Sequence, residues 1–328
     1  MKLNLEQIRE ITRGVTRVEE IDGYFRFFRF TEAQAQYYLD AGQTDYYNKT
    51  NATAGVRLAF STDATGISFD FSLLVGYSRA FAWFDVYVNG AMIRHVGCEN
   101  SAMQGGKISF PFRVDGEKTV EIYFPWSRTV CVSNVILEDA SFVKPIYRKR
   151  KMIAFGDSIT QGYDAIYPSN AYAIALARLL DADVTNKGIG GDVFCPDMLR
   201  DADPEKPDFI TVAYGINDWN KTSPEAYRTN CPAFFRRLHE LYPDATIFGI
   251  SPIWFGEPEK QTAFGIPAYR VHDRMQELCS DIPNLRLIRG WDFVPHVSDF
   301  YSDFILHPND LGFGFYTQNL YRTIMESV

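Results

Sequence analysis

Four short segments in the C-terminal half of the chain combine glycines or a proline with polar side chains of the kind used in catalysis. Among them, Ser158 and His307 offer a nucleophile and a base, because a serine hydroxyl reacts only when a neighbouring group takes its proton. Asp303 is the nearest acid upstream of His307, and a carboxylate can hold an imidazole in the productive tautomer. These residue types are those of acyl transfer through a serine. The four segments are residues 155–162, 186–192, 214–218 and 303–310.

Each of these residues alone has an ordinary structural explanation. Ser158 could cap a helix, Asn217 could form a turn, and His307 could be a surface histidine. Asp157 and Asp218 flank the candidate positions and are expected to brace loops. The four segments together, in this order, favour a catalytic role over the structural one.

The elements that must position these segments follow from the C-terminal half of the sequence, where short apolar runs alternate with helical patterns. Such alternation predicts a parallel sheet with helices on both faces. Ligands bind beyond the carboxyl ends of parallel strands, and three of the four segments follow predicted strands. The predicted strands are residues 152–155, 183–186, 209–213, 246–250 and 285–288, and the predicted helices are 171–180, 224–242, 268–279 and 310–325.

The N-terminal half has a different pattern. From Tyr24 to about Phe142, apolar and polar residues alternate in short runs that are separated by turn signals such as Asn89-Gly90. This pattern predicts an antiparallel β-sandwich or jelly roll, for which the simplest interpretation is an accessory layer without chemistry of its own, although the sequence leaves its role open. We therefore expect two domains, an accessory β-sandwich at residues 1–146 and an α/β catalytic domain at residues 147–328.

The four segments resemble the conserved blocks of the SGNH hydrolases, also called GDSL-type esterases and lipases, over about residues 150–328. The resemblance implies a flavodoxin-like three-layer domain in which Ser158 is the nucleophile and His307 the base. It also implies an oxyanion hole formed by the backbone N–H groups of Ser158 and Gly191 and by the side chain of Asn217. A β-sandwich ahead of such a domain is similar to the arrangement in carbohydrate acetyl esterases.

The spacing of the acid departs from the family pattern. The family has Asp-x-x-His, which places the acid at position 304, but that residue is Phe304. A bulge of one residue would allow Asp303 to fill the role, and Asp299 and Asp310 are alternatives. In some relatives with an N-terminal β-domain, backbone carbonyls orient the histidine in place of an acid.

The resemblance and two tryptophans predict the substrate. Trp219 and Trp254 follow the third and fourth strands of the parallel sheet and are candidate contacts for a sugar ring or a lipid chain, although both could be rim packing. We expect an esterase that removes O-acetyl groups from a carbohydrate, such as a soluble oligosaccharide, through an acyl-Ser158 intermediate. The alternatives are a lipid esterase or acyl-thioesterase, and a carbohydrate-binding protein that has lost activity.

Composition excludes some classes of function. The 328 residues carry a net charge of −8, which argues against nucleic acid as a partner. The first residues lack the apolar core of a signal peptide, and no stretch is apolar enough to span a membrane, so a cytoplasmic location is expected. Five scattered cysteines predict neither disulfides nor a zinc site. We expect no metal and no cofactor, and the sequence does not indicate an oligomeric state.

Overall fold

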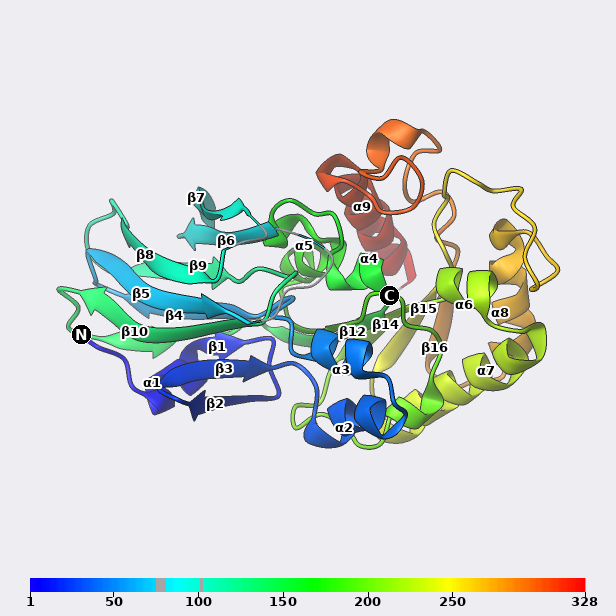
Figure 1. The fold of residues 1–328 in the computed structure, drawn as a ribbon, viewed down its shortest axis with the longest axis horizontal. Helices are drawn as coiled ribbons and strands as arrows, with labels where there is room; N and C mark the ends of the chain where they lie inside the picture. Colours follow the sequence, from blue (N-terminus) through cyan, green and yellow to red (C-terminus); the bar gives the residue numbers. More distant parts are fainter. Residues whose placement is uncertain (75–78, 80, 101–102, 328) are drawn as a thin grey trace.

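The structure, a computed structural model, describes residues 1–74, 79, 81–100 and 103–327. Two antiparallel sheets occupy the N-terminal part and one parallel sheet with flanking helices occupies the C-terminal part (Figure 1). The parallel sheet starts at β12 (Arg150–Gly156), soon after the last antiparallel strand, β11 (Val143–Pro145). The boundary at residues 146 and 147 lies between these two strands, and the division into two domains there stays a prediction.

The first antiparallel sheet has the strand order β1-β4-β9-β6-β7, and β11 pairs with the same edge of β4 as β1. Its strands are β1 (Thr12–Arg13), β4 (Arg57–Thr62), β6 (Phe81–Val88), β7 (Ala91–Glu99), β9 (Lys118–Tyr123) and β11 (Val143–Pro145).

The second antiparallel sheet has the order β2-β3-β10-β5-β8. Its strands are β2 (Arg17–Ile21), β3 (Tyr24–Phe28), β5 (Gly66–Leu73), β8 (Gly105–Pro111) and β10 (Val130–Glu138). Helix α1 (Leu5–Ile11) precedes β1. One apolar core contains side chains from both sheets, among them Phe27, Phe84 and Phe124, which meet edge to face. The predicted sandwich of antiparallel sheets is therefore present, whereas its jelly-roll connection stays a prediction.

The third sheet is parallel throughout, with the order β13-β12-β14-β15-β16. Numbered along the chain this order is 2-1-3-4-5, which is the flavodoxin-like order. The strands are β12 (Arg150–Gly156), β13 (Ala182–Gly188), β14 (Phe209–Ala213), β15 (Thr246–Ile250) and β16 (Leu285–Ile288).

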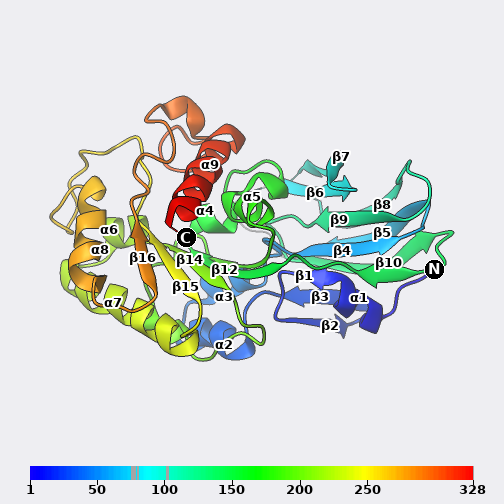
Figure 2. The same cartoon turned by 180° about the vertical axis from the view of Figure 1, so that it is seen from behind.

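Helices cover both faces of this sheet, as the sequence predicts (Figure 2). Along β12, Ile153 and Phe155 belong to the core that α7 and α8 complete, whereas Met152 and Ala154 belong to the core of α5 and α9. The helices are α4 (Ser158–Gln161), α5 (Tyr172–Leu179), α6 (Ile216–Lys221), α7 (Pro224–Leu241), α8 (Val271–Cys279) and α9 (Asp310–Ser327), with single 3-10 turns at Pro168–Asn170, Pro196–Met198, Ala268–Arg270 and Ser298–Phe300.

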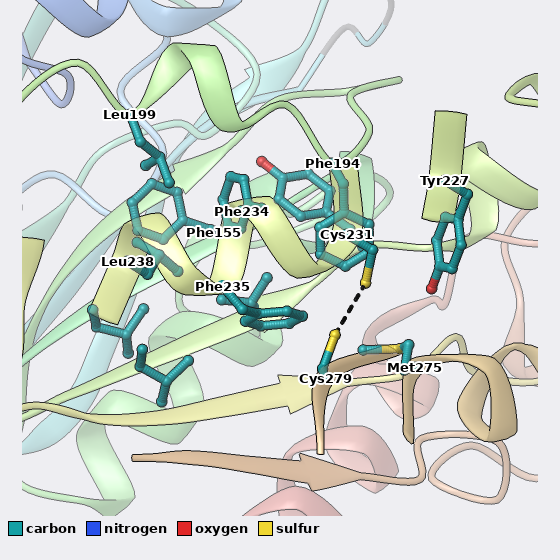
Figure 3. Close-up of a cluster of buried hydrophobic side chains, with 14 of the residues drawn as sticks. Phe155, Phe194, Leu199, Tyr227, Cys231, Phe234, Phe235, Leu238, Met275 and Cys279 are labelled. Carbon is teal, nitrogen blue, oxygen red and sulfur yellow. Dashed lines mark hydrogen bonds between the residues drawn. The ribbon is translucent and has the colours of Figure 1, made fainter. Parts of the chain in front are cut away.

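The core beneath α7 and α8 is rich in aromatic rings. Phe194, Phe234 and Phe235 contact one another there, and Figure 3 shows that Cys231 and Cys279 point toward each other beside them. Their Sγ atoms are 3.7 Å apart, which is a thiol hydrogen bond and not a disulfide. All five cysteines are free, in agreement with the sequence-based prediction.

Two helices between β3 and β4 correct the sequence-based prediction, which expected this half to be a β-sandwich built from short strands. These are α2 (Glu32–Asp40), which Thr31 caps through a hydrogen bond from the Gln34 N–H, and α3 (Thr44–Thr50). Of α2 only Gln34 and Tyr38 are buried, so the helix has no apolar stripe that a periodicity of the sequence would indicate. Both helices pack against the parallel-sheet part of the chain.

None of the helices in the described part of the chain has the length and apolar character needed to cross a membrane.

Candidate active site

Ser158 lies at the carboxyl end of β12, which pairs with β13 on one side and β14 on the other, and a sharp turn leads from it into α4. Gly156 permits this turn, because a Cβ there would lie 2.0 Å from Thr160 Oγ1 and 2.8 Å from the Ala213 carbonyl oxygen. Asp157 caps α4 by accepting a hydrogen bond of 3.0 Å from the Ile159 N–H. Ser158 is therefore the first residue of the helix, with only 7% of its surface exposed.

The side chains of Ser158, His307 and Asp303 form a continuous hydrogen-bonded chain. Ser158 Oγ lies 2.9 Å from His307 Nε2, and His307 Nδ1 lies 2.7 Å from Asp303 Oδ2. If Nδ1 carries the ring proton, Nε2 is free to accept the proton of the serine hydroxyl. The geometry therefore suits a base-activated serine nucleophile.

The extra residue between Asp303 and His307 is accommodated by a tight loop. Phe304 adopts a left-handed backbone conformation, with φ of 61°, and its side chain is 65% exposed. The loop closes around Asp303 Oδ1, which accepts backbone N–H groups from Ile305, Leu306 and His307 at 3.0, 2.7 and 3.1 Å. Asp303 thus reaches the histidine in spite of the altered spacing.

These contacts keep Asp303 ionised. Partial burial raises the pKa of this carboxyl, but hydrogen bonds from the His307 ring and from the loop N–H groups outweigh burial, so that the pKa falls well below its usual range. A second acid that the sequence-based prediction missed, Asp164, places Oδ2 3.8 Å from His307 Nδ1. Asp164 is buried and forms an ion pair with Arg79. Its position after α4 has no motif in the sequence, so only the fold brings it to the histidine.

The other two acids considered from the sequence are held elsewhere. Asp310 accepts hydrogen bonds from the Ile166 N–H at 2.9 Å and from Asn170 Nδ2 at 3.0 Å. Asp299 lies in the 3-10 turn before the histidine loop. The acids within ion-pair distance of His307, among the residues that the structure describes, are Asp303 and Asp164.

Asp164, Asp303 and His307 are also a group whose ligand atoms lie within 4.8 Å of one another, close enough to hold a cation. In this structure, however, His307 Nδ1 is already 2.7 Å from Asp303, and Asp164 is paired with Arg79. Both carboxylates therefore already have partners within the protein, and Asp303 orients the imidazole of His307.

The three predicted oxyanion donors, Gly191, Ser158 and Asn217, follow the carboxyl ends of β13, β12 and β14, which are neighbours in the parallel sheet. Gly191 has φ of 92°, a conformation that favours glycine, and within the described residues its N–H and that of Ser158 have no acceptor. Asn217, in the first turn of α6, donates one Nδ2 hydrogen to the Asp192 carbonyl oxygen at 3.1 Å, which leaves the other available. These donors lie at the same edge of the parallel sheet, and the oxyanion hole that they would form stays a prediction.

Three buried carboxyl groups lie beneath this site. Burial raises the pKa of Asp157 and of Asp192 to about 6 and that of Asp218 to about 7. Asp218 accepts the Phe194 N–H at 3.2 Å, and Asp157 caps α4, so both brace loops as expected.

The structure corrects one of the two predicted substrate contacts. Trp219 is only 2% exposed, and its indole N–H donates to the Ile266 carbonyl oxygen at 2.7 Å, which places it in the core below the site. Trp254 is partly exposed and stacks on His296, with ring centroids 5.5 Å apart. It lies on the loop that bonds to the histidine loop through the Gly256 N–H and the Ile305 carbonyl oxygen, so it remains a candidate contact.

A small cavity adjoins the site at the carboxyl ends of β12, β14 and β15. It has a volume of about 20 Å³, and sequence neighbours of Ser158, Asn217 and His307 line it. Among these are Ile159, which follows Ser158, Ile216, which precedes Asn217, and Leu306, which precedes His307.

Comparisons with known proteins assign a family to the C-terminal part of the chain. Residues 154–314 match the model of the GDSL-like lipase/acylhydrolase family, so the C-terminal part of the chain is a domain of that family, as the sequence motifs predicted. The comparison with curated proteins found no match.

Solved structures with a similar fold cover nearly the whole chain. The salicylyl-acyltransferase SsfX3 from a tetracycline biosynthetic pathway is 20% identical, with a TM-score of 0.82, and the match covers 99% of this chain and 97% of that one. A putative GDSL-like lipase from Bacteroides ovatus is 18% identical, with a TM-score of 0.77 and coverage of 98% and 96%. The acetyl xylan esterase Est2A from Butyrivibrio proteoclasticus is 15% identical, with a TM-score of 0.63 and coverage of 100% and 98%. At these identities the likeness establishes the fold, including the sandwich ahead of the α/β part.

Proposed function

We propose that the protein is a serine esterase that hydrolyses O-acetyl esters on a carbohydrate through an acyl-Ser158 intermediate. The observation that carries this proposal is the chain of contacts from Ser158 Oγ through His307 to Asp303, at 2.9 and 2.7 Å. His307 takes the serine proton during attack, returns it to the leaving alcohol, and then activates the water that releases the acyl group. Asp303 stabilises the imidazolium that forms in each step.

The oxyanion of each tetrahedral intermediate would be stabilised by the Ser158 and Gly191 N–H groups and by Asn217. Each such donor contributes about 3–4 kcal/mol to the stability of the transition state. Two of these donors belong to the backbone and the third is tied to the Asp192 carbonyl, so they are fixed before substrate arrives.

We assign the acyl group to the small cavity at the carboxyl ends of β12, β14 and β15, which Asp157 and Ile159 line and which would admit a group of acetyl size. Its volume of about 20 Å³ is close to the minimum that holds one water molecule, and its lining is largely apolar. The similar folds of carbohydrate esterases such as Est2A support a sugar as the alcohol part of the ester. Trp254, partly exposed beside the histidine loop, is the side chain that we assign to the face of a sugar ring.

The test compares the hydrolysis of acetylated xylo-oligosaccharides with that of short-chain and long-chain p-nitrophenyl esters, in the wild type and in Ser158→Ala. The proposal predicts turnover of acetyl esters that Ser158→Ala abolishes. Faster turnover of long chains would favour a lipid esterase or acyl-thioesterase. Glycan binding by both proteins, without release of acetate, would favour a binding protein that has lost activity.

Transfer of the acyl group to an alcohol instead of water is the second candidate, because one of the fold matches above, with a TM-score of 0.82, is to an acyltransferase. The same acyl-Ser158 would serve both reactions. Adding an acceptor alcohol to the assay distinguishes them: a transferase forms the new ester at the expense of free acetate.

A further inference from the structure

Helices α2 and α3, which belong to the N-terminal part of the chain, lie against the glycine-rich loop that carries the Gly191 N–H (Figure 1). Tyr38 of α2 donates to Asp192 Oδ2 at 2.9 Å, and Tyr46 of α3 donates to the Gly191 carbonyl oxygen at 2.8 Å. These contacts join residues that the sequence separates by about half the chain. They place the N-terminal helices directly on the candidate oxyanion hole.

A further contact from α3, made by Lys49, acts on the peptide group that supplies the oxyanion donor. Lys49 Nζ donates to the Gly190 carbonyl oxygen at 2.9 Å, and this carbonyl belongs to the same planar peptide as the Gly191 N–H. In a trans peptide the C=O and N–H bonds point in opposite directions, so holding the oxygen fixes the direction of the hydrogen. The positive charge of the ammonium next to this oxygen also polarises the amide, which makes the N–H a stronger hydrogen-bond donor.

The lysine itself is held in place from two sides. Its ammonium pairs with Asp45 Oδ2 at 2.6 Å, and only 14% of its side chain is exposed. Its own carbonyl oxygen accepts a hydrogen bond of 2.8 Å from Arg29, which has no exposed surface. Arg29 also donates to the carbonyl oxygens of Asn186 and Gly188, at the end of β13. Arg29 therefore ties the backbone of α3 to the strand from which the glycine loop starts.

From this geometry we infer that Lys49 is a positioning residue for the oxyanion hole and that the N-terminal part of the chain takes part in catalysis through it. The inference rests on the proposed esterase function. It would extend to the N-terminal part a chemistry whose identifiable residues the sequence places on the C-terminal side of the boundary. Lys49 touches no reacting atom and acts through the Gly190–Gly191 peptide. Its loss should therefore destabilise the transition state and leave the affinity for substrate nearly unchanged.

The test replaces Lys49 by methionine, which keeps the length of the chain and removes the charge and donor. We expect kcat on p-nitrophenyl acetate to fall about 10- to 100-fold, somewhat less than on loss of a whole oxyanion donor, with KM within about twofold. An alkyl boronic acid that forms a tetrahedral adduct with Ser158 should bind more weakly by the same factor as kcat/KM falls. Lys49→Arg, which still donates to the carbonyl, should restore most of the rate.

Lys118→Met is the matched control. Lys118 is also a lysine of the N-terminal part that donates to a backbone carbonyl, that of Ala64 at 2.8 Å, but it lies within the sandwich and has no contact with the glycine loop. Both variants lose a hydrogen bond from a lysine to a backbone carbonyl. Their melting temperatures show how much of any change in activity comes from reduced stability. An equal kcat in Lys49→Met and Lys118→Met, with a wild type that depends on Ser158, would overturn the inference and leave the proposed function intact.

A measurement without turnover separates the two proposals. In protein labelled with isotopic nitrogen at glycine, the amide resonance of Gly191 should shift in Lys49→Met and stay in place in Lys118→Met. If the wild type shows no turnover that depends on Ser158, the proposed function fails. The Gly191 resonance still tests whether Lys49 fixes the Gly190–Gly191 peptide. An unchanged Gly191 resonance in Lys49→Met overturns the inference.

Discussion

Replacing Asp303 by asparagine separates the charge of the orienting acid from the loop that carries it. The oxygen of the new amide can keep the three backbone N–H bonds that Asp303 Oδ1 accepts, so the loop is retained. The amide NH2 group then takes the place of Oδ2, 2.7 Å from His307 Nδ1. Because an NH2 group donates, Nδ1 has to accept, and the ring proton moves to Nε2. That nitrogen can then no longer take the proton of Ser158.

The size of the effect follows from two contributions. Loss of a hydrogen bond to a charged group costs about 1.5–3 kcal/mol, which is about a 10- to 150-fold loss of rate. Fixing the wrong tautomer raises the loss toward the roughly 10⁴-fold known for this change in a serine triad. We expect Asp303→Asn to lower kcat by about 10³- to 10⁴-fold. Asp303→Ala should lower it by about 10²-fold, because Asp164 at 3.8 Å can then approach Nδ1.

The assay is steady-state hydrolysis of p-nitrophenyl acetate, with melting temperatures to show that each variant is folded. Asp164→Asn is the matched control, since it removes the acid that lies farther from Nδ1, and we expect it to lose less activity than Asp303→Asn. A kcat of Asp303→Asn within tenfold of the wild type would refute the reasoning. So would a larger loss in Asp164→Asn, which would transfer the orienting role to Asp164.

Three further predictions concern stability, the acyl group and the sugar. Burial holds the pKa of Asp218 at about 7, so the folded protein keeps a proton that the unfolded chain, with an aspartate pKa of about 4, has released. The free energy of unfolding in urea should therefore fall between about pH 5 and about pH 7.5, and Asp218→Asn should reduce that difference; an unchanged difference contradicts the assignment. Ile216→Ala enlarges the small cavity, and its ratio of butyrate to acetate hydrolysis should rise about tenfold, whereas a constant ratio would place the acyl group elsewhere. Trp254→Ala should raise KM for acetylated oligosaccharides about tenfold without changing that for p-nitrophenyl acetate, and Trp219→Phe should lower the melting temperature without a selective effect on sugars. Equal effects of the two tryptophan changes on the sugar substrates would contradict the placement of Trp219 in the core.

The parallel sheet was predictable because short strand-like segments, several of them apolar runs, alternate with helical patterns along this half of the chain. Residues 209–213 and 246–250 coincide with β14 and β15, and the polar segments that follow the strands meet at one edge of the sheet. Ser158 and Asn217 follow the ends of β12 and β14, which pair directly in the sheet. Local sequence patterns were sufficient here, because the residues of each strand by themselves indicate a strand.

Other parts of the site depend on contacts that no local pattern encodes. The left-handed conformation of Phe304 is stabilised by the side chain of Asp303, which gathers the N–H groups of the residues after it. Asp164 reaches the histidine only because the turn after α4 packs beside it. The bond from Lys49 to the Gly190 carbonyl joins the two halves of the chain, and α3 carries too few apolar residues for its position to be inferred from periodicity.

The central claim is that Ser158 carries the acyl group during turnover. Mixing the enzyme with an excess of p-nitrophenyl acetate, quenching with acid and mapping the peptides by mass spectrometry tests it directly. We predict a burst of p-nitrophenol and an acetyl group on the peptide of residues 152–178 at Ser158, both absent from Ser158→Ala. Acetylation of another residue, or turnover at an unchanged rate in Ser158→Ala, would contradict the account.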